Sequence, residues 1–492
     1  MRLFNLLLLA ALSFSSVFGE VQKSNIVFIF ADDLGYGDIQ CLNPNRGKIP
    51  TPGVDLLAAE GLIFTDAHTT SSVCTPSRYG LLTGRYNWRS KLQKFVLSNA
   101  EEPLIASDRM TLGNLLQQQG YQTACIGKWH LGFKFDVADD FVPKKVKLSA
   151  GFPVGTKIID GPQTRGFDYY FGFHHARWMS TLIEKDEIIA EIDVIEMLPR
   201  MQDKAIGYIN DYGNSKREKP FFLYLPLGSP HTPIVPSAEW QGKSPLGPYG
   251  DFVMQSDAVV GAVINTLKAN DLDGDTLVIF SSDNGCSKAA KIDKLIEGGH
   301  YPSANLRGSK ADLWDGGHRV PFVMRWPNGP IQAGTRSDEL ISLVDVFATF
   351  SEMQGVALPE HQAEDSFSFL PAISGGKLDV NRKGVIHHSI SGLFALRNNQ
   401  YKLLLCPGSG GWSSPKDSEA RKESLPEMQL YDMSIDVSEQ NNLINEKPEV
   451  AEMMLKTLKL YVANGRTREG TGSANDVEVD LWKKNKKKTN KK

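Results

Sequence analysis

The run Cys74-Thr75-Pro76-Ser77-Arg78 holds a sulfur nucleophile and a permanent positive charge four residues apart. Four residues are about one helical turn, so a helix that begins at Cys74 places both side chains on one face. A helix N-terminus and a nearby cation both favour the thiolate, and the segment therefore predicts a reactive cysteine. The same pattern is also typical of a small, buried side chain in front of a helix that starts with proline.

Two other segments carry paired oxygen ligands. Asp32 and Asp33 follow the apolar residues 26–30, and Asp283 and Asn284 follow the apolar residues 277–280. Carboxylate and amide oxygens are the ligands that Ca²⁺ and Mg²⁺ prefer. Either pair alone is also common in turns, so it is their shared position after apolar runs that indicates a metal site.

Basic and titratable side chains occupy three further segments. Lys128 and His130 lie in residues 127–132, His231 lies between Pro230 and Pro233, and Lys310 ends residues 306–310. Lysines supply positive charge for an anionic group, and histidines exchange protons near neutral pH. Prolines restrict the backbone around His231, which indicates a fixed orientation.

Four apolar runs do not alternate with polar residues, as is typical of buried parallel strands. These runs are residues 26–30, 123–127, 221–227 and 277–280. Helical patterns such as residues 111–119 and 251–269 lie between them, which predicts an α/β fold with a doubly wound sheet. Ligand sites in such sheets lie beyond the carboxyl ends of the strands, so we expect the polar segments to converge.

The character of the chain changes near Asn381. Short apolar segments within residues 384–406 and 429–432 predict a small antiparallel sheet, and residues 448–463 predict a helix. We therefore predict a catalytic domain over residues 20–380, a smaller C-terminal α+β subdomain over 381–465, and a flexible, lysine-rich tail over 466–492. The loop 407–415, rich in Gly, Ser and Pro, is expected to be flexible or to face the substrate.

The N-terminus predicts export. Arg2, the apolar residues 3–12 and small residues up to Gly19 are typical of a signal peptide over residues 1–19. No later apolar run is long enough to cross a bilayer. We expect a periplasmic or extracellular protein, and the absence of any N-x-S/T sequon favours a bacterial source.

Charge and cysteine content limit the partners. The net charge is −3, but seven lysines lie in residues 483–492, so the rest of the chain is acidic and no nucleic-acid partner is expected. The lysines form either a solvated end or a weakly adhesive one for anionic glycans. Four cysteines besides Cys74 allow three full disulfide pairings, which the sequence does not rank: Cys41, Cys125, Cys286 and Cys406.

The segment C-x-P-S-R followed by L-T-G resembles the motif of the type I, formylglycine-dependent sulfatases, an arylsulfatase-like family of the alkaline phosphatase superfamily. The other segments resemble further blocks of that family, over residues 22 to about 465. The resemblance implies an alkaline-phosphatase-like α/β fold with a mixed, mostly parallel sheet flanked by helices. It also implies that a maturation enzyme oxidises Cys74 to formylglycine.

The resemblance assigns roles to individual residues. It implies a Ca²⁺ site, with Mg²⁺ as the alternative, formed by Asp32, Asp33, the modified Cys74, Asp283 and Asn284. It implies catalytic roles for Cys74, Arg78, Lys128, His130, His231 and Lys310. Of these, Lys128, His231 and Lys310 bind the sulfate group, His231 with Lys310 protonates the leaving alcohol, and His130 accepts a proton when sulfate is released.

The function implied is hydrolysis of sulfate esters on a sulfated oligo- or polysaccharide. Two alternatives remain open: a phosphonate or phosphate monoester hydrolase of the same superfamily, and a non-catalytic glycan binder in which Cys74 is unmodified. Other histidines are secondary. We expect His318 to be structural, and we assign no role to His300, although its position before residues 306–310 would allow it to touch the substrate. His174-His175 and His387-His388, if extended, each point to opposite faces, so that one of each pair could line a pocket.

Overall fold

The computed structural model describes residues 23–98, 102–378 and 381–483. The expected signal peptide, residues 1–19, and the lysines from position 484 onward lie outside the described residues. A ten-stranded sheet dominates the fold, in the order β13-β2-β12-β11-β1-β10-β4-β7-β8-β9. Its strands are β1 (Asn25–Asp32), β2 (Leu62–Phe64), β4 (Gln122–Lys128), β7 (Tyr169–Phe173), β8 (Thr181–Glu184), β9 (Glu187–Glu191), β10 (Phe221–Pro230), β11 (Thr276–Ser282), β12 (Phe322–Arg325) and β13 (Thr335–Ser337).

The middle of this sheet is parallel, because β11, β1, β10, β4 and β7 pair in one direction. β12 and the edge strands β8 and β9 run antiparallel to their neighbours. All eight residues of β1 and all ten of β10 are buried, which explains the unbroken apolar runs of their sequences. The predicted mixed, mostly parallel sheet is confirmed.

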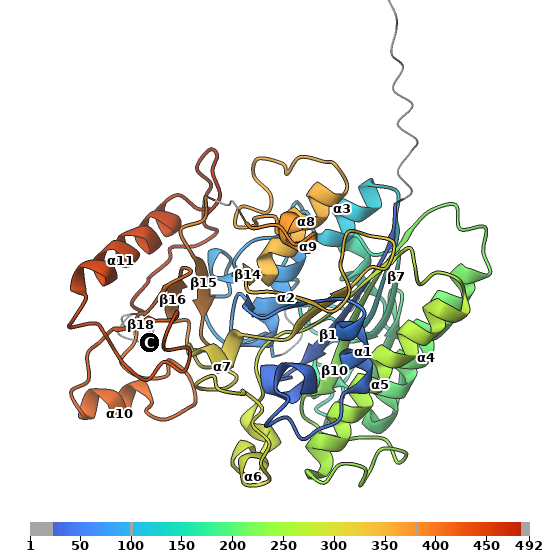
Figure 1. Ribbon diagram of the computed structural model, residues 1–492. Coiled ribbons are helices and arrows are strands. Elements are labelled where there is room, and N and C mark those ends of the chain that lie inside the picture. The colour runs from blue at the N-terminus through green and yellow to red at the C-terminus, as the bar shows by residue number, and fades with distance from the viewer. Residues whose placement is uncertain (1–22, 99–101, 379–380, 484–492) are drawn as a thin grey trace, which may run out of the picture.

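Helices cover both faces of the sheet (Figure 1). On one face, α1, α4 and α5 pack against Val27 and Ile29 of β1. On the other face, α2, α3, α8 and α9 pack against Ile26 and Phe28. Successive side chains of β1 point to opposite faces of the sheet, so the strand contributes to two hydrophobic cores. The helices are α1 (Pro52–Ala59), α2 (Cys74–Thr83), α3 (Leu112–Gln118), α4 (Met197–Gly213), α5 (Gly247–Ala269), α6 (Ile292–Glu297), α7 (Asp315–His318), α8 (Val346–Met353), α9 (Leu370–Ile373), α10 (Asp417–Lys422) and α11 (Pro448–Ala463).

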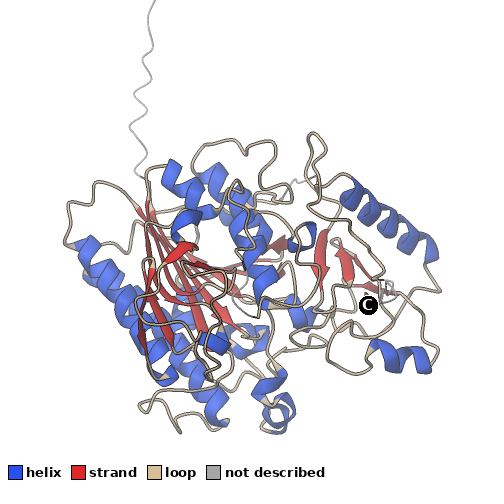
Figure 2. Cartoon of the chain, turned by 180° about the vertical axis from the view of Figure 1, so that it is seen from behind, coloured by secondary structure: helices blue, strands red, loops and turns tan. Residues whose placement is uncertain are grey.

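A four-stranded antiparallel sheet forms beside the large one (Figure 2). It consists of β15 (Val385–His388), β16 (Phe394–Arg397), β17 (Tyr401–Leu404) and β18 (Gln429–Asp432). Helix α11 packs on it through Met454 and Leu458, and Trp88 of the large domain joins the same hydrophobic cluster. Two two-stranded pairs complete the fold: β3 (Ala67–His68) with β14 (Ile341–Ser342), and β5 (Lys134–Phe135) with β6 (Ile158–Asp160).

The chain after α11 differs in part from the expected flexible tail. Arg466 pairs with Glu360 at 2.8 Å, and Asp476 pairs with Arg85 at 2.8 Å. Lys483 donates a hydrogen bond to Gln93 at 2.9 Å. These contacts hold residues 466–483 against the large domain.

The structure also bears on the cysteines and on membrane-spanning helices. Cys41, Cys74, Cys125, Cys286 and Cys406 all lie within the described residues, and none of them forms a disulfide. Among the described helices, none combines the length and the apolar character that crossing a membrane requires.

Candidate active site

The predicted polar residues meet at the carboxyl edge of the parallel strands. Asp32 ends β1 and Lys128 ends β4, while Asp283 follows β11 and His231 follows β10. Because β11, β1, β10 and β4 are consecutive in the sheet, their ends deliver these side chains to one place. This is the usual location of a ligand site in an α/β sheet.

The turn after β1 shows how the sequence shapes this edge. Asp33, rather than a glycine, adopts the left-handed conformation, with φ of 66°. Gly35 and Gly37 are needed for space instead, since a Cβ on either would lie 2.2 Å from the backbone oxygen of Pro302 or Tyr301.

Cys74 is the first residue of α2 and points into the cluster. Its Sγ lies 3.3 Å from Asp32 Oδ1, 3.8 Å from Asp33 Oδ1 and 3.5 Å from Lys310 Nζ. The side chain is almost completely buried. Burial, followed by the charge of Asp283, raises the pKa of the Cys74 thiol well above its usual value, so the unmodified thiol stays protonated.

Arg78 lies one turn further along α2, on the same side, as the spacing predicts. Its Nε and Nη2 donate to Asp283 Oδ2 at 3.0 and 2.7 Å, and its Nη1 donates to the carbonyl of Lys128 at 3.0 Å. Arg78 and Asp283 are both fully buried. The guanidinium thus fixes the end of β11 against the end of β4.

Two lysines neutralise the carboxylates of the β1 turn. Lys128 Nζ contacts Asp32 Oδ2 at 2.5 Å, and Lys310 Nζ makes a short contact with Asp33 Oδ1. Burial alone would raise the pKa of Asp32, but Lys128, His231, Arg78 and Lys310 outweigh it and hold the pKa well below the usual range. Burial and the charge of Asp32 raise the pKa of Asp283.

His231 lies at the mouth of the cluster. Its side chain is 18% exposed, whereas that of Asp32 is fully buried. Its Nδ1 donates to the carbonyl of Thr232 at 2.6 Å, and its Nε2 faces Asp33 Oδ2 at 3.6 Å. Burial lowers the pKa of His231, and Asp33 partly opposes this. Nε2 is therefore the nitrogen that a substrate can reach.

His130 is buried behind Lys128. Its Nε2 donates to the carbonyl of Leu97 at 2.8 Å, and its buried Nδ1 has no hydrogen-bond partner among the described residues. Burial, followed by the charge of Lys128, lowers the pKa of His130 well below its usual value. The ring is neutral, with a lone pair on Nδ1 free to accept a proton.

A divalent cation fits this cluster. Asn284 Nδ2 donates to Asp33 Oδ1 at 2.8 Å, which leaves the buried Asn284 Oδ1 with no partner among the described residues. Ligand atoms of Asp32, Asp33, Cys74 and His231 lie within 4.8 Å of one another. Carboxylate and amide oxygens suit Ca²⁺ or Mg²⁺. Three carboxylates, Asp32, Asp33 and Asp283, face three cations, so an added divalent ion would leave the site positively charged.

A second cluster of histidines lies elsewhere and is unsuited to a metal ion. His68, His318 and His387 are buried with ligand atoms within 4.8 Å of one another. However, the rings of His318 and His387 stack at 3.7 Å with an interplanar angle of 11°, so no ion can lie in both ring planes. Lys402 Nζ is also 3.1 Å from His318 Nε2. This cluster joins β3 and α7 to β15 and agrees with a structural His318.

His300 and the pair His174-His175 are all buried. His300 is fully buried and faces Asp38 at 2.8 Å, so its ring is not open to a substrate. His174 and His175 follow β7 rather than lying within it, and their Nδ1 atoms are 2.8 Å apart. Strand alternation therefore does not separate this pair. The ring of His175 stacks on His130 at 5.3 Å, which makes it a neighbour of the site that spacing alone did not reveal.

The loop 407–415 is held in place by hydrogen bonds along its length. The backbone N–H groups of Trp412 and Ser413 donate to Asp312 Oδ1 at 2.7 and 3.0 Å. Asp312 lies two residues after Lys310, so the loop is attached to the segment that brings Lys310 to the cluster. Its Ser413 and Ser414 line a cavity beside the site.

Comparison with known proteins identifies the family. A family model described as Sulfatase matches residues 24–356. The N-acetylgalactosamine-6-O-sulfatase of Bacteroides thetaiotaomicron is 32% identical over 497 residues, which covers 89% of this chain and 93% of the relative.

Solved structures agree. A protein of Bacteroides thetaiotaomicron from the metabolism of multiple glycosaminoglycans matches with a TM-score of 0.77 and 28% identity, over 89% of this chain and 99% of the other. Ps i-CgsB in complex with k-i-k-neocarrahexaose matches with a TM-score of 0.71 and 25% identity, over 92% and 95%. The chain therefore belongs to the sulfatase family and is a sulfuric ester hydrolase with an alkaline-phosphatase-like fold.

Proposed function

We propose that this enzyme removes sulfate from a sulfated carbohydrate, using a formylglycine made from Cys74 and a bound Ca²⁺, with Mg²⁺ as the alternative. The carrying observation is the position of Cys74, whose Sγ lies within 3.8 Å of Asp32, Asp33 and Lys310. A nucleophile, the oxygens for a cation and the positive charges for an anion thus share one buried site. The carbohydrate substrate is supported by the bacterial relative, which acts on an N-acetylgalactosamine 6-O-sulfate.

The chain's own residues divide the work. When present, the aldehyde would supply a hydrated carbonyl as nucleophile, and the divalent ion would offset negative charge on the sulfate oxygens. Lys128 and Lys310 orient the sulfate group by charge, and Arg78 holds Asp283 in position for the ion. With both ring nitrogens protonated, His231 donates the proton that the leaving alcohol needs from Nε2, which lies at the mouth. His130 Nδ1 accepts the proton when sulfate departs.

The positive charges of the site would attract a phosphate or phosphonate ester as well as a sulfate ester. Kinetic measurements must therefore separate the two reactions. Parallel measurements of kcat/KM on an aryl sulfate and an aryl phosphonate are the direct comparison. A larger kcat/KM for the phosphonate would replace the proposed function with phosphonate hydrolysis. Binding of sulfated glycan without turnover by fully modified enzyme would replace it with a glycan-binding role.

Mass spectrometry of the peptide that contains residue 74 tests the nucleophile. The protein should be produced with a formylglycine-generating maturation enzyme, the partner that this chemistry requires. We expect the loss of the thiol and the gain of an aldehyde, in proportion to activity on a defined sulfated oligosaccharide. An unmodified thiol in fully active enzyme would refute the assignment.

Export is part of the same proposal. It is supported by the N-terminal sequence, with cleavage after Gly19. Sequencing the N-terminus of the protein recovered from the periplasm or medium of a bacterial host tests it, and recovery of the full-length chain only from cytoplasm would contradict it.

A further inference from the structure

Two cavities rich in unpaired cations flank the active site. The first, the α6 cavity, has a volume of about 780 Å³ and contains Lys288, Lys291, Lys294 and Arg307 in its lining. The second, the Trp178 cavity, has a volume of about 730 Å³ and is lined by Lys144, Lys145, Lys147, Arg177 and Trp178, among others. Each therefore presents four cationic side chains to solvent.

The α6 cavity adjoins the catalytic lysine. Ser309 lines the cavity and directly precedes Lys310, and Lys288 lies four residues after Asn284. Arg307 stacks over Trp314, with Cζ 3.7 Å from the ring centroid, which fixes its guanidinium at the cavity wall. A group bound here would therefore contact the residue that directly precedes Lys310.

The Trp178 cavity adjoins the site from the other side. The ring of Trp178 lies 5.1 Å from that of His175, and His175 stacks on His130. The sheet order β11-β1-β10-β4-β7 explains the arrangement. The α6 cavity lies beyond the end of β11 and the Trp178 cavity beyond the end of β7. At about 4.8 Å per strand, the two outer strands are roughly 19 Å apart, a span that suits an oligosaccharide rather than a single sugar.

Among the residues that the structure describes, the cations of both cavities have no anionic partner. Within residues 23–98, 102–378 and 381–483, none of these eight side chains forms an ion pair. Lys288 contacts only the carbonyl of Trp412, and Arg307 Nη1 donates to the carbonyl of Glu439 at 2.7 Å. The α6 cavity also contains Asp293 and Glu297, so four cations face two acids there. Of the described residues that line the Trp178 cavity, none is acidic.

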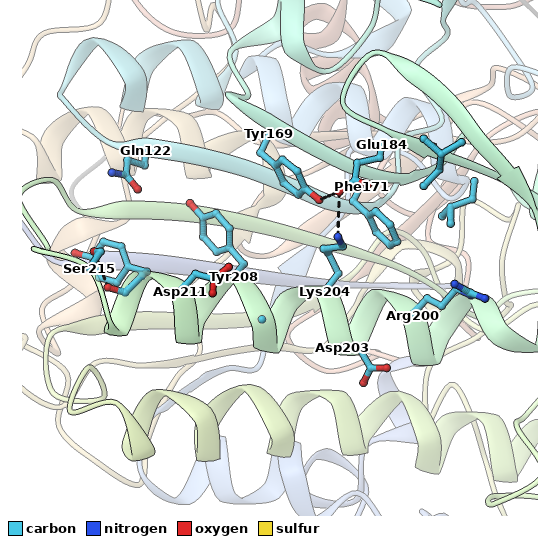
Figure 3. Close-up of a pocket in the computed structure, with 14 residues that line it drawn as sticks. Gln122, Tyr169, Phe171, Glu184, Arg200, Asp203, Lys204, Tyr208, Asp211 and Ser215 are labelled. Atoms are coloured by element: carbon cyan, nitrogen blue, oxygen red, sulfur yellow. Dashed lines mark hydrogen bonds and ion pairs between the residues drawn. The ribbon is translucent and has the colours of Figure 1, made fainter. Parts of the chain in front are cut away.

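A cavity on the far part of the sheet provides the contrast. It has a volume of about 870 Å³ and lies between α4 and strands β7 to β9 (Figure 3). Its Lys204 already pairs with Glu184 at 3.0 Å. Asp203 and Asp211 add further negative charge to its lining. This cavity does not suit an anion, so unpaired positive charge is a property of the two cavities beside the active site.

We propose that the α6 cavity and the Trp178 cavity bind anionic groups on the sugars that neighbour the one losing its sulfate. The inference rests on the proposed function and narrows its substrate to a glycan with several anionic groups. These groups are sulfate esters or carboxylates, because both offer oxygen acceptors with negative charge to lysine and arginine. The free monosaccharide sulfate fills only the buried centre and leaves both cavities empty.

Binding measurements test this with Cys74→Ala protein, which retains the cavities but cannot turn substrate over. The probes are three hexasaccharides: desulfated chondroitin with carboxylates only, a sulfated galactan with sulfates only, and chondroitin 6-sulfate with both. Two triple variants each remove the lysines of one cavity. The first, for the α6 cavity, is Lys288→Ala/Lys291→Ala/Lys294→Ala, and the second, for the Trp178 cavity, is Lys144→Ala/Lys145→Ala/Lys147→Ala. The matched control is the triple variant Lys216→Ala/Lys219→Ala/Lys456→Ala. These three lysines are also exposed, but the first two lie before β10 and the third lies on α11.

We expect each cavity triple to weaken binding of at least one hexasaccharide about tenfold, and added salt to reduce the difference. The control triple should bind like the parent. The carboxylate-only and sulfate-only probes identify which group each cavity takes. Equal binding by the cavity triples and the control for all three probes would overturn the inference.

A separate readout keeps the proposed function distinct. This readout uses enzyme that keeps Cys74 and carries it as formylglycine. In this enzyme, neither cavity triple should change the desulfation of N-acetylgalactosamine 6-sulfate. If the parent enzyme desulfates no sulfated sugar, the proposed function fails, while the binding data still decide on the cavities. If the cavity triples lose activity on the monosaccharide as much as on hexasaccharides, the assignment to neighbouring sugars is wrong.

Discussion

Replacement of Arg78 by alanine should strip the buried partner from Asp283. The guanidinium makes two hydrogen bonds to one oxygen of Asp283, at 3.0 and 2.7 Å, and both side chains are fully buried. Its removal leaves Asp283 close to Asp32 with no cation in direct contact. Breaking a buried pair in this way costs about 3–5 kcal/mol of the free energy of unfolding.

The exposed pair Arg200–Glu196 provides the matched control. Its atoms approach to 2.6 Å, but each side chain is 47% exposed, and such pairs contribute below about 1 kcal/mol. Both variants should be unfolded with urea in the presence of a chelator, so that metal binding does not contribute. With equal m-values, the Arg78→Ala midpoint should fall several times further than that of Arg200→Ala.

A rescue variant tests the cause. If the cost is an unpaired buried carboxylate, adding Asp283→Asn to Arg78→Ala should restore part of the lost stability, because the amide is neutral. The double variant will bind metal poorly, which the chelator makes irrelevant to the comparison. The reasoning would be refuted if the Arg78→Ala variant were as stable as the Arg200→Ala variant. It would also be refuted if the double variant were less stable than Arg78→Ala alone.

Three further outcomes follow from the structure. The substitution Asn284→Leu removes the unpartnered amide oxygen. Calorimetry should then show that the Ca²⁺ affinity falls about tenfold or more. An unchanged affinity would exclude Asn284 as a ligand. Cys74→Ala should abolish desulfation while the urea midpoint of the apoprotein stays near that of the parent, and residual turnover would contradict the nucleophile assignment. Burial lowers the pKa of His387 well below its usual value, with His68 and Lys402 adding to the effect. The unfolded chain therefore gains a proton below about pH 6.5 that the folded chain does not, and acid reduces stability. His387→Gln should reduce the loss between pH 7 and pH 5 by about 2 kcal/mol, and an unchanged pH dependence of the urea midpoint would contradict this.

The parallel core and its strand ends could be predicted because burial leaves a plain mark on the sequence. Residues 26–30 and 221–227 are apolar throughout, and they lie within β1 and β10, which are buried on both faces. The polar residues that end or follow such a run lie at or near the carboxyl end of the strand. Asp32 and His231 could therefore be placed in a common site before any coordinates were known.

Other features depend on contacts that sequence spacing does not encode. β2 is only three residues long, and its pairing with β12 and β13 gives no periodic signal. His68, His318 and His387 come from three distant segments and meet only through the docking of the two sheets. The lysines of the α6 cavity are likewise ordinary surface residues in the sequence, and only the fold brings them into one cavity with Arg307 and Ser309.

The depth of Cys74 sets an order of events for the maturing protein. The side chain is 2% exposed in the folded chain, and its walls come from Asp32, Asp283 and Lys310, which are far apart in the sequence. An enzyme that oxidises this thiol cannot reach it once those walls have closed. If Cys74 is converted to formylglycine as proposed, the oxidation must precede folding, and the time between synthesis and collapse of the sheet then limits how much of the protein becomes active.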